Sequence, residues 1–226
     1  MYADNIVIMA NSKAKLQQAV ITWASACRER GMGIIASKSK TVHIAEGIQR
    51  WLNIQWEGER MEKVAKMECL GTIMNVNGKI DIEINNRVQK ANQFYYQINQ
   101  TIADKKKINN HNKMRIYKIV YLQSLHYGSE SWTILTRHAS KITGAEVSYW
   151  RKCTWKTRRG RIINRKFRGI LNQEPVTKMV DKRKLRWFGN LIRLDRNRKP
   201  MHVRETRVEV PRGRGSPRIK WEEYMQ

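Results

Sequence analysis

Several residue types are scarce in this chain of 226 residues, and each scarcity excludes a class of protein. Its three cysteines, Cys27, Cys69 and Cys153, are far apart, odd in number and form no Cys-x-x-Cys pair, which argues against a disulfide framework or a zinc site. No apolar run is long enough to span a bilayer, and no signal peptide opens the chain. We therefore expect an intracellular protein of the nucleus or cytoplasm, with no membrane partner.

Acidic residues are also scarce: 19 Asp and Glu stand against 45 Lys and Arg, giving a formal net charge of +26 and a pI of about 10.4. The excess is uneven, because residues 151–226 hold 24 basic and 7 acidic residues, net +17, and residues 1–150 hold 21 and 12, net +9. So strong a positive field favours a polyanionic partner, most often nucleic acid. The plainer alternative is a solvated basic surface.

The chain opens on Tyr2-Ala3-Asp4-Asn5, followed by the apolar run from Ile6 to Met9. Asp4 offers the hard oxygen ligands that Mg²⁺ prefers, and two such ions can clamp the attacking and leaving oxygens of a phosphoryl transfer. The unbroken apolar run predicts a strand buried on both faces. The alternative is that Asp4 and Asn5 form only a polar turn before a strand.

This opening resembles the Tyr-Ala-Asp-Asp motif of reverse transcriptases, and later segments, in the right order, resemble the endonuclease–reverse transcriptases of non-LTR retrotransposons. The segment 31–40 resembles the family's glycine–apolar–lysine loop, and 67–71 resembles its Phe-x-Tyr-Leu-Gly. The clearest matches are 127–132, which reads Tyr-Gly-Ser-Glu-Ser-Trp, and 184–190, which reads Lys-Leu-Arg-Trp-Phe-Gly-Asn. The segment 213–221 is similar to the family's closing Gly-Arg-Pro-x-x-x-Trp.

The resemblance implies RNA-directed DNA polymerase chemistry with dNTP as substrate, Mg²⁺ as cofactor and an RNA or DNA template–primer duplex as partner. It assigns Asp4 to metal binding and catalysis, Lys38 to general acid catalysis, and Leu70 and Gly71 to a primer-grip-like hairpin. Asn5 stands where the family has a second aspartate, so the metal site is degenerate. The palm strand with another metal-binding aspartate would lie upstream of Met1. We therefore expect a fragment that is inactive in isolation, since each lost electrostatic group costs about 10²–10³ in rate.

Hydrophobic periodicity predicts an α+β fold. Residues 1–78 should form a partial palm of short strands plus one helix, with a strand over 64–73 and turns at Glu57-Gly58 and Asn77-Gly78. Residues 79–136 should form thumb-like helices, with one helix over 80–102 and a central one over 113–127. A basic helical region, 137–200, and a flexible basic tail, 201–226, complete the expected organisation.

Basic residues interleaved with aromatic ones suit phosphate contacts and base stacking, so the alternative function is a non-catalytic nucleic-acid-binding protein derived from the same element. Trp187 has a second interpretation, as a core residue of its helix, and a rarely translated, decayed gene copy is a third possibility for the whole chain. The candidate nucleic-acid-binding residues are Lys105, Lys106, Lys107, Arg158, Arg159, Arg161, Arg165, Lys182, Arg183, Arg186, Trp187 and Arg193.

Overall fold

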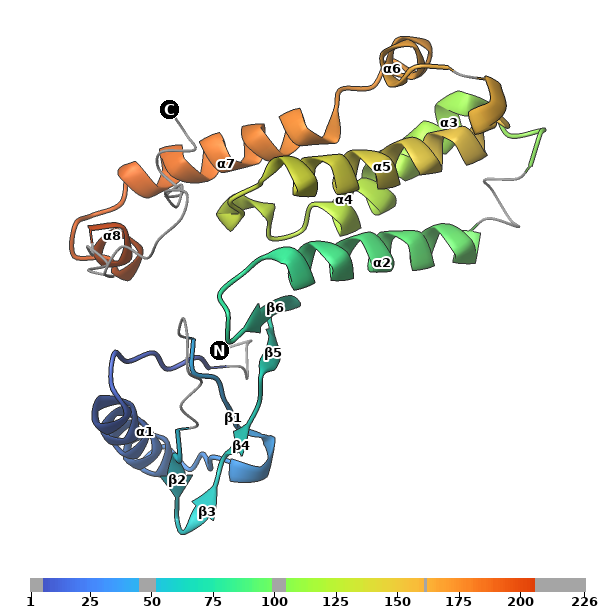
Figure 1. The fold of residues 1–226 in the computed structure, drawn as a ribbon. Coiled ribbons are helices and arrows are strands. Elements are labelled where there is room, and N and C mark those ends of the chain that lie inside the picture. The colour runs from blue at the N-terminus through green and yellow to red at the C-terminus, as the bar shows by residue number, and fades with distance from the viewer. Residues whose placement is uncertain (1–5, 45–51, 99–104, 161, 206–226) are drawn as a thin grey trace, which may run out of the picture. The chain divides into compact units, whose positions relative to one another are not determined.

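The computed structural model describes residues 6–44, 52–98, 105–160 and 162–205, and it has the expected α+β fold (Figure 1). The chain divides into two compact units, Met1–Glu83 and Ile84–Gln226, which we describe separately. The first contains one long helix and short strands, and the described elements of the second are all helical. No described helix is both long enough and apolar enough to cross a lipid bilayer.

The first unit is built from helix α1, a short 3₁₀ turn and three two-stranded sheets. Helix α1 begins where the Ser12 hydroxyl accepts a hydrogen bond from the Lys15 N–H at 3.3 Å, the usual N-cap arrangement. Strands β1 and β4 pair in parallel, whereas β2–β3 and β5–β6 are antiparallel hairpins. The elements are α1 (Lys13–Arg28), η1 (Ala36–Lys38), β1 (Lys40–Thr41), β2 (Gln55–Trp56), β3 (Glu59–Arg60), β4 (Glu62–Lys63), β5 (Lys66–Cys69) and β6 (Thr72–Asn75).

The core of this unit is small and lies between α1 and the first hairpin. Val20, Ile54 and Met61 form its buried centre, and Ile8 and Trp56 pack partly buried against it. Trp23, one turn along α1 from Val20, is 37% exposed. The buried position next to it on the helix is taken by Ala24.

Two expectations for the first unit are wrong. The run from Ile6 to Met9 is not a strand: no described strand pairs with it, and Met9 is 81% exposed. The predicted strand over 64–73 is the β5–β6 hairpin, because Leu70 and Gly71 both take positive φ and reverse the chain. The turns at Glu57-Gly58 and at Asn77-Gly78 are confirmed.

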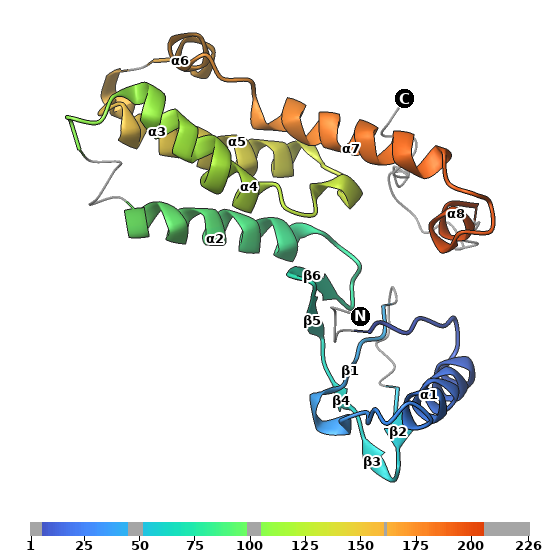
Figure 2. The same cartoon turned by 180° about the vertical axis from the view of Figure 1, so that it is seen from behind.

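The second unit packs its long helices side by side, with α5 next to both α7 and the 110–125 helix (Figures 1 and 2). The 110–125 helix contains a π-helical segment, labelled η3, which lengthens one turn. The elements of the second unit are α2 (Asp81–Ile98), α3 (Asn110–Ile116), η3 (Tyr117–Tyr121), α4 (Leu122–Leu125), η4 (Ser129–Ser131), α5 (Thr136–Cys153), η5 (Arg158–Gly160), α6 (Asn164–Leu171), α7 (Val176–Ile192) and α8 (Lys199–Glu205).

Tyrosines fill the centre of this unit, and the expectation that the 113–127 segment is central is confirmed. Tyr117 and Tyr121 are fully buried, and their rings lie 5.3 and 4.5 Å from the ring of Tyr149 on α5. The Tyr121 hydroxyl lies 3.2 Å from the side-chain Oδ1 atom of Asn92, and this contact joins α2 to the cluster. Aromatic rings bury much area, and their hydroxyl groups find partners inside the core.

A buried carboxylate, Glu146 on α5, accepts hydrogen bonds from two other elements. Its Oε1 atom accepts from the Tyr117 hydroxyl at 2.9 Å and from the Val176 N–H at 3.0 Å. Its Oε2 atom lies 3.5 Å from Arg168 Nη2 on α6. Burial outweighs these favourable partners and raises the pKa of Glu146 to about 7.

We predict a specific pH dependence of stability from Glu146. Since its folded pKa lies above the ordinary value of 4.5, its stabilising contribution is complete below about pH 4.5 and is lost as pH rises through about 7. Glu146→Gln should remove this dependence, so the free energy of unfolding of the variant relative to wild type should rise between pH 5 and 8, by up to about 3 kcal/mol. Urea unfolding across this range checks it, and parallel curves for the two proteins would contradict it.

Candidate nucleic-acid interface

Helix α7 carries basic side chains along one exposed face. Val176, Val180 and Leu191 are buried on one side of the helix, and the opposite side faces solvent. Lys178, Lys182, Arg186 and Arg193 recur there at spacings of four, four and seven, and all four are exposed. We call these four residues the α7 stripe. At 1.5 Å of rise per residue it is about 22 Å long.

The charges of the stripe are neutralised unequally. Lys182 Nζ lies 2.6 and 2.8 Å from the two carboxylate oxygens of Glu174, so this exposed pair offsets one charge. The Arg193 guanidinium donates to the neutral Asn190 Oδ1 at 2.7 Å and keeps its full charge. Arg186 makes no side-chain hydrogen bond or ion pair with the described residues. The C-terminal part of the stripe, with Arg186 and Arg193, therefore keeps more of its positive charge than the part around Lys182.

Arg183 has a structural role, unlike its neighbours on the stripe. Its Nη1 atom donates to Glu130 Oε1 at 3.0 Å and its Nη2 atom to Gln123 Oε1 at 2.7 Å. These bonds fasten α7 to η4 and α4, within the segment that follows the π-helical turn. The guanidinium is thus occupied within the fold, although the sequence groups it with the binding residues.

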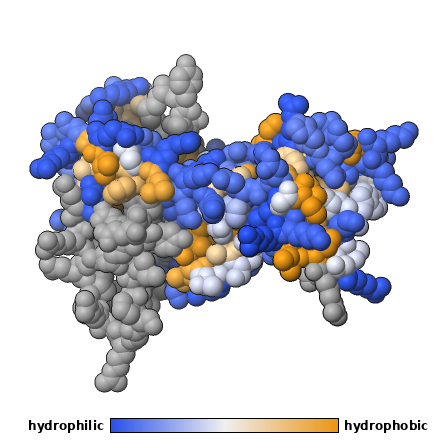
Figure 3. All heavy atoms as spheres, turned by 90° about the horizontal axis from the view of Figure 1, so that it is seen from above, coloured by the Kyte–Doolittle hydropathy of each residue, from blue (hydrophilic) through white to orange (hydrophobic). Residues whose placement is uncertain are grey.

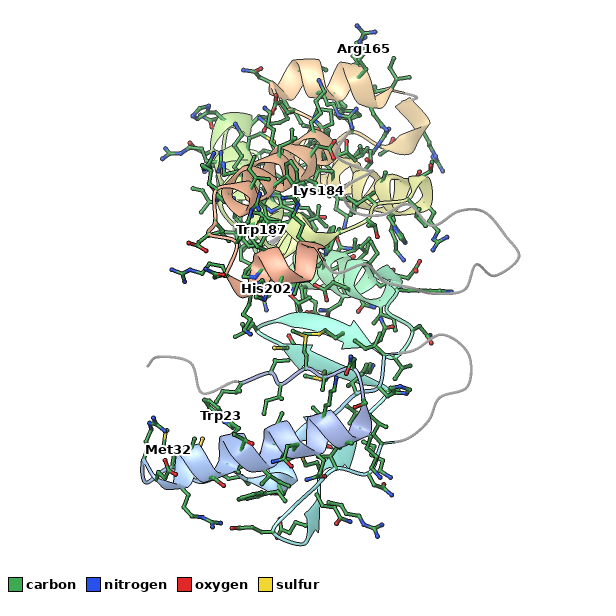
Figure 4. The ribbon with its side chains drawn as sticks, turned by 90° about the vertical axis from the view of Figure 1, so that its left-hand side faces the viewer. Trp23, Met32, Arg165, Lys184, Trp187 and His202 are labelled. Atoms are coloured by element: carbon green, nitrogen blue, oxygen red, sulfur yellow. The ribbon has the colours of Figure 1, made fainter. Side chains whose placement is uncertain are left out.

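Trp187 and Lys184 come from the same motif but lie in different surroundings. Trp187 is 40% exposed, so its ring lies partly at the surface rather than wholly in the core (Figure 4). Lys184 is fully buried among the helices, and this burial lowers the pKa of its ammonium group to about 8, against the opposing effect of Asp181. Lys184 contributes to packing, whereas Trp187 is partly exposed on a different side of the helix from the stripe, because successive helical positions are rotated by about 100°.

The remaining basic candidates lie away from α7. Arg159 on η5 and Arg165 on α6 are exposed, and Figure 4 shows Arg165 pointing away from the neighbouring helices. Lys105, Lys106 and Lys107 are also exposed, and Lys106 Nζ lies 5.6 Å from the centre of the Trp155 ring. Arg161 lies outside the described residues, as does the side chain of Arg158. The face shown in Figure 3 is mostly hydrophilic, with smaller hydrophobic patches.

The structure describes only some of the candidate site residues of the first unit. Lys38 ends the exposed turn η1, and Leu70 and Gly71 form the tip of the β5–β6 hairpin. Asp4 and Asn5 lie outside the described residues. Among the residues that are described, no group of three His, Cys, Asp or Glu side chains could hold a metal ion. The assignments of Asp4, Asn5, Lys38, Leu70 and Gly71 remain predictions.

Sequence reasoning missed a groove at the end of α5. Its lining includes Arg151, Lys152, Trp155 and Lys156, and Trp155 is 53% exposed. A signal was present, because Trp155 stands in a basic run, Arg151-Lys152-Cys153-Thr154-Trp155-Lys156, of the same kind that drew attention to Trp187. What the sequence did not reveal is that the helix ends there.

Comparison with known proteins supports an origin of the chain in a transposable element. The chain is 25% identical over 202 residues to a protein of Caenorhabditis elegans described as an uncharacterized transposon-derived protein. The match covers 85% of this chain and 70% of that protein. No family model matches the chain, and no solved structure matches it.

The division between structural and exposed arginines on α7 gives a prediction about stability. Arg183→Ala should lower the free energy of unfolding by about 1–2 kcal/mol, because it removes the charge-assisted hydrogen bond to Glu130 and the hydrogen bond to Gln123. Arg186→Ala should change it by less than about 0.5 kcal/mol. Chemical denaturation of both variants checks the contrast, and equal losses would show that Arg186 also supports the fold.

Proposed function

We propose that this chain is the C-terminal part of a non-LTR retrotransposon reverse transcriptase and that its helical unit binds nucleic acid. The observation that carries the binding proposal is the α7 stripe, in which Arg186 and Arg193 are exposed without an acidic partner among the described residues. The family resemblance, the transposon-derived relative and the net charge of +17 over residues 151–226 support it.

The spacing of the stripe suits a phosphate backbone. Neighbouring positions four residues apart are about 6 Å apart along the helix, comparable to successive phosphates of a nucleic-acid strand. Contacts of this kind position a duplex and carry no sequence information. The proposed partner is therefore an RNA or DNA duplex held by its backbone, as a thumb holds a template–primer.

We propose no polymerase activity for this chain in isolation. Asn5 provides a neutral carbonyl where the resemblance calls for a second carboxylate, so Asp4 would hold divalent cations with one negative charge fewer. Mg²⁺, when bound to such a motif, supplies a clamp for the attacking and leaving oxygens. We derive no catalytic step through the metal.

Nucleic-acid binding by the stripe is tested with a double variant. Arg186→Gln with Arg193→Gln should weaken binding to a fluorescent RNA–DNA duplex and lower the slope of log K against log salt by about 1–2, because two phosphate contacts are lost. Fluorescence anisotropy at several salt concentrations measures this. The matched control is Lys13→Gln with Lys15→Gln, which removes two exposed charges from the start of α1. If the control weakened binding equally, the loss would reflect the net charge of the chain and not contacts of the stripe.

Primer extension on an RNA template tests the proposed inactivity. With Mg²⁺ or Mn²⁺ the chain should extend the primer no more than an Asp4→Ala variant does. Extension clearly above that background would show that Asp4 supports catalysis despite Asn5. Because both proteins keep the basic helical unit, the comparison is independent of how tightly they bind the template–primer.

A further inference from the structure

The groove at the C-terminal end of α5 has a volume of about 610 Å³ and lies on the helical unit. Its floor is the side of α5 that carries Gly144 and Ser148, and Trp155 and Lys156 stand at the end where α5 stops. None of its lining residues is acidic. A second hollow of about 570 Å³ adjoins it, because Gly144 and Asn164 line both.

Trp155 has a backbone conformation that suits it poorly. Its φ is +58°, in the left-handed region, and it directly follows Thr154, the C-cap of α5. The N–H of Trp155 donates to the Lys152 carbonyl at 3.3 Å, and that of Lys156 donates to the Arg151 carbonyl at 3.0 Å. This pair of bonds is the Schellman motif, whose left-handed position is usually glycine.

Two other helices of the chain end in the same way, with residues that suit the position. At the end of α1 the left-handed residue is Gly31, and the next N–H, of Met32, bonds to the Cys27 carbonyl at 2.9 Å. At the end of α6 it is Asn172, and the Gln173 N–H bonds to Arg168 at 3.1 Å. Glycine and asparagine tolerate this conformation, whereas a bulky aromatic residue does so at a cost. Folding alone therefore gives no reason for tryptophan at position 155.

Burial of the ring does not compensate for the strained backbone of Trp155 either, since 53% of the residue is exposed. The loop that carries it is nevertheless fixed: the Arg151 guanidinium donates to the carbonyls of Thr157 at 3.1 Å and Ile162 at 2.9 Å. Arg151 also lies over the Phe167 ring at 5.0 Å, which ties the loop to α6. A strained, exposed ring on a held loop is an arrangement that favours ligand binding over stability.

Positive charge surrounds this ring. Lys106 Nζ lies 5.6 Å from its centre, and Lys156, which lines the groove, is exposed with no ion pair to the described residues. Lys152 lines the groove and lies over the Tyr95 and Tyr96 rings at 4.3 and 4.7 Å. An exposed aromatic face beside unpaired cations is the combination that binds single-stranded nucleic acid, with a base on the ring and phosphates on the cations.

We propose that this groove binds an unpaired nucleotide of a single-stranded nucleic acid, with its base stacked on Trp155 and its phosphates close to Lys152 and Lys156. The inference rests on the proposed function, which it extends from duplex phosphates to an unpaired strand. A base inside a duplex is stacked on its neighbours and cannot reach the ring, so the groove discriminates single strands and overhangs from blunt duplexes.

The test uses Trp155→Gly, which removes the ring and places the preferred residue at the left-handed position, so the full chain should fold at least as well. Its affinity for a fluorescent single-stranded oligonucleotide should fall by about 5- to 100-fold, as expected for one lost stacking contact. Its affinity for a blunt duplex of equal length should change less than about twofold. Trp155→Phe, which keeps a ring on the same backbone, should retain most of the single-strand affinity.

A second variant tests the groove while leaving Trp155 in place. A Cβ atom at Gly144 meets no heavy atom within 4 Å, so this position has room for a side chain, and Gly144→Leu should narrow the groove at the end away from Trp155. It should raise the midpoint of thermal unfolding, since leucine favours a helix more than glycine does, and should weaken single-strand binding, but less than Trp155→Gly because position 144 is about three helical turns from Trp155.

The outcomes separate this inference from the proposed function. Unchanged single-strand affinity in both variants, with the α7 double variant still defective, would overturn the groove and leave the stripe. Equal losses for single strand and duplex would show that Trp155 has a structural role and would also overturn the inference. If the wild-type chain bound neither probe, the proposed function itself would fail.

Discussion

The buried carboxylate of Glu146 is the interaction on which the arrangement of the helical unit depends. It is fully buried on α5 and accepts hydrogen bonds from Tyr117 on η3 and from the first N–H of α7, with Arg168 of α6 beside it. Burying a carboxylate is costly unless partners satisfy its oxygens, so the elements must meet at this point. Where α7 begins, and hence which side of it faces solvent, follows from this contact.

Three acidic residues of the helical unit form ion pairs within it. Glu146 joins α5 to α6 and α7, Glu130 holds α7 through Arg183, and Glu174 pairs with Lys182 near the start of the same helix. Cations elsewhere on α7, at Arg186 and Arg193, are left without acidic partners among the described residues. Such an excess of one sign destabilises a compact state by repulsion. A bound polyanion would relieve that repulsion, which connects the charge distribution to the proposed function.

Much of the fold could be predicted from the sequence because its signals are local. The helical period over 80–102 and the Asn77-Gly78 turn each specify a nearby backbone geometry. The helix is found as α2 over Asp81–Ile98, with 99–102 outside the described residues, and the turn is found as expected. The strand predicted at Ile6–Met9 failed because a strand needs a partner, which an apolar run alone does not supply. Glu146 could not be foreseen either, since its partners lie 22 to 30 residues away along the chain.

The candidate site likewise combines features that could be predicted from local sequence signals with features that could not. Basic residues that recur every three or four positions predict a basic face on a helix, so the α7 stripe could be predicted. The internal role of Arg183 could not, because it depends on where Gln123 and Glu130 lie in the fold. Trp155 was missed for the opposite reason: its meaning lies in a backbone angle that no pattern of residue types displays. Glycine would end α5 at lower cost, as Gly31 ends α1, so the tryptophan is a local choice that conflicts with the fold. Conflicts of this kind are expected where a residue serves a ligand, and that is why the proposed ligand of the helical unit is inferred from a strained helix end rather than from the densest cluster of charge.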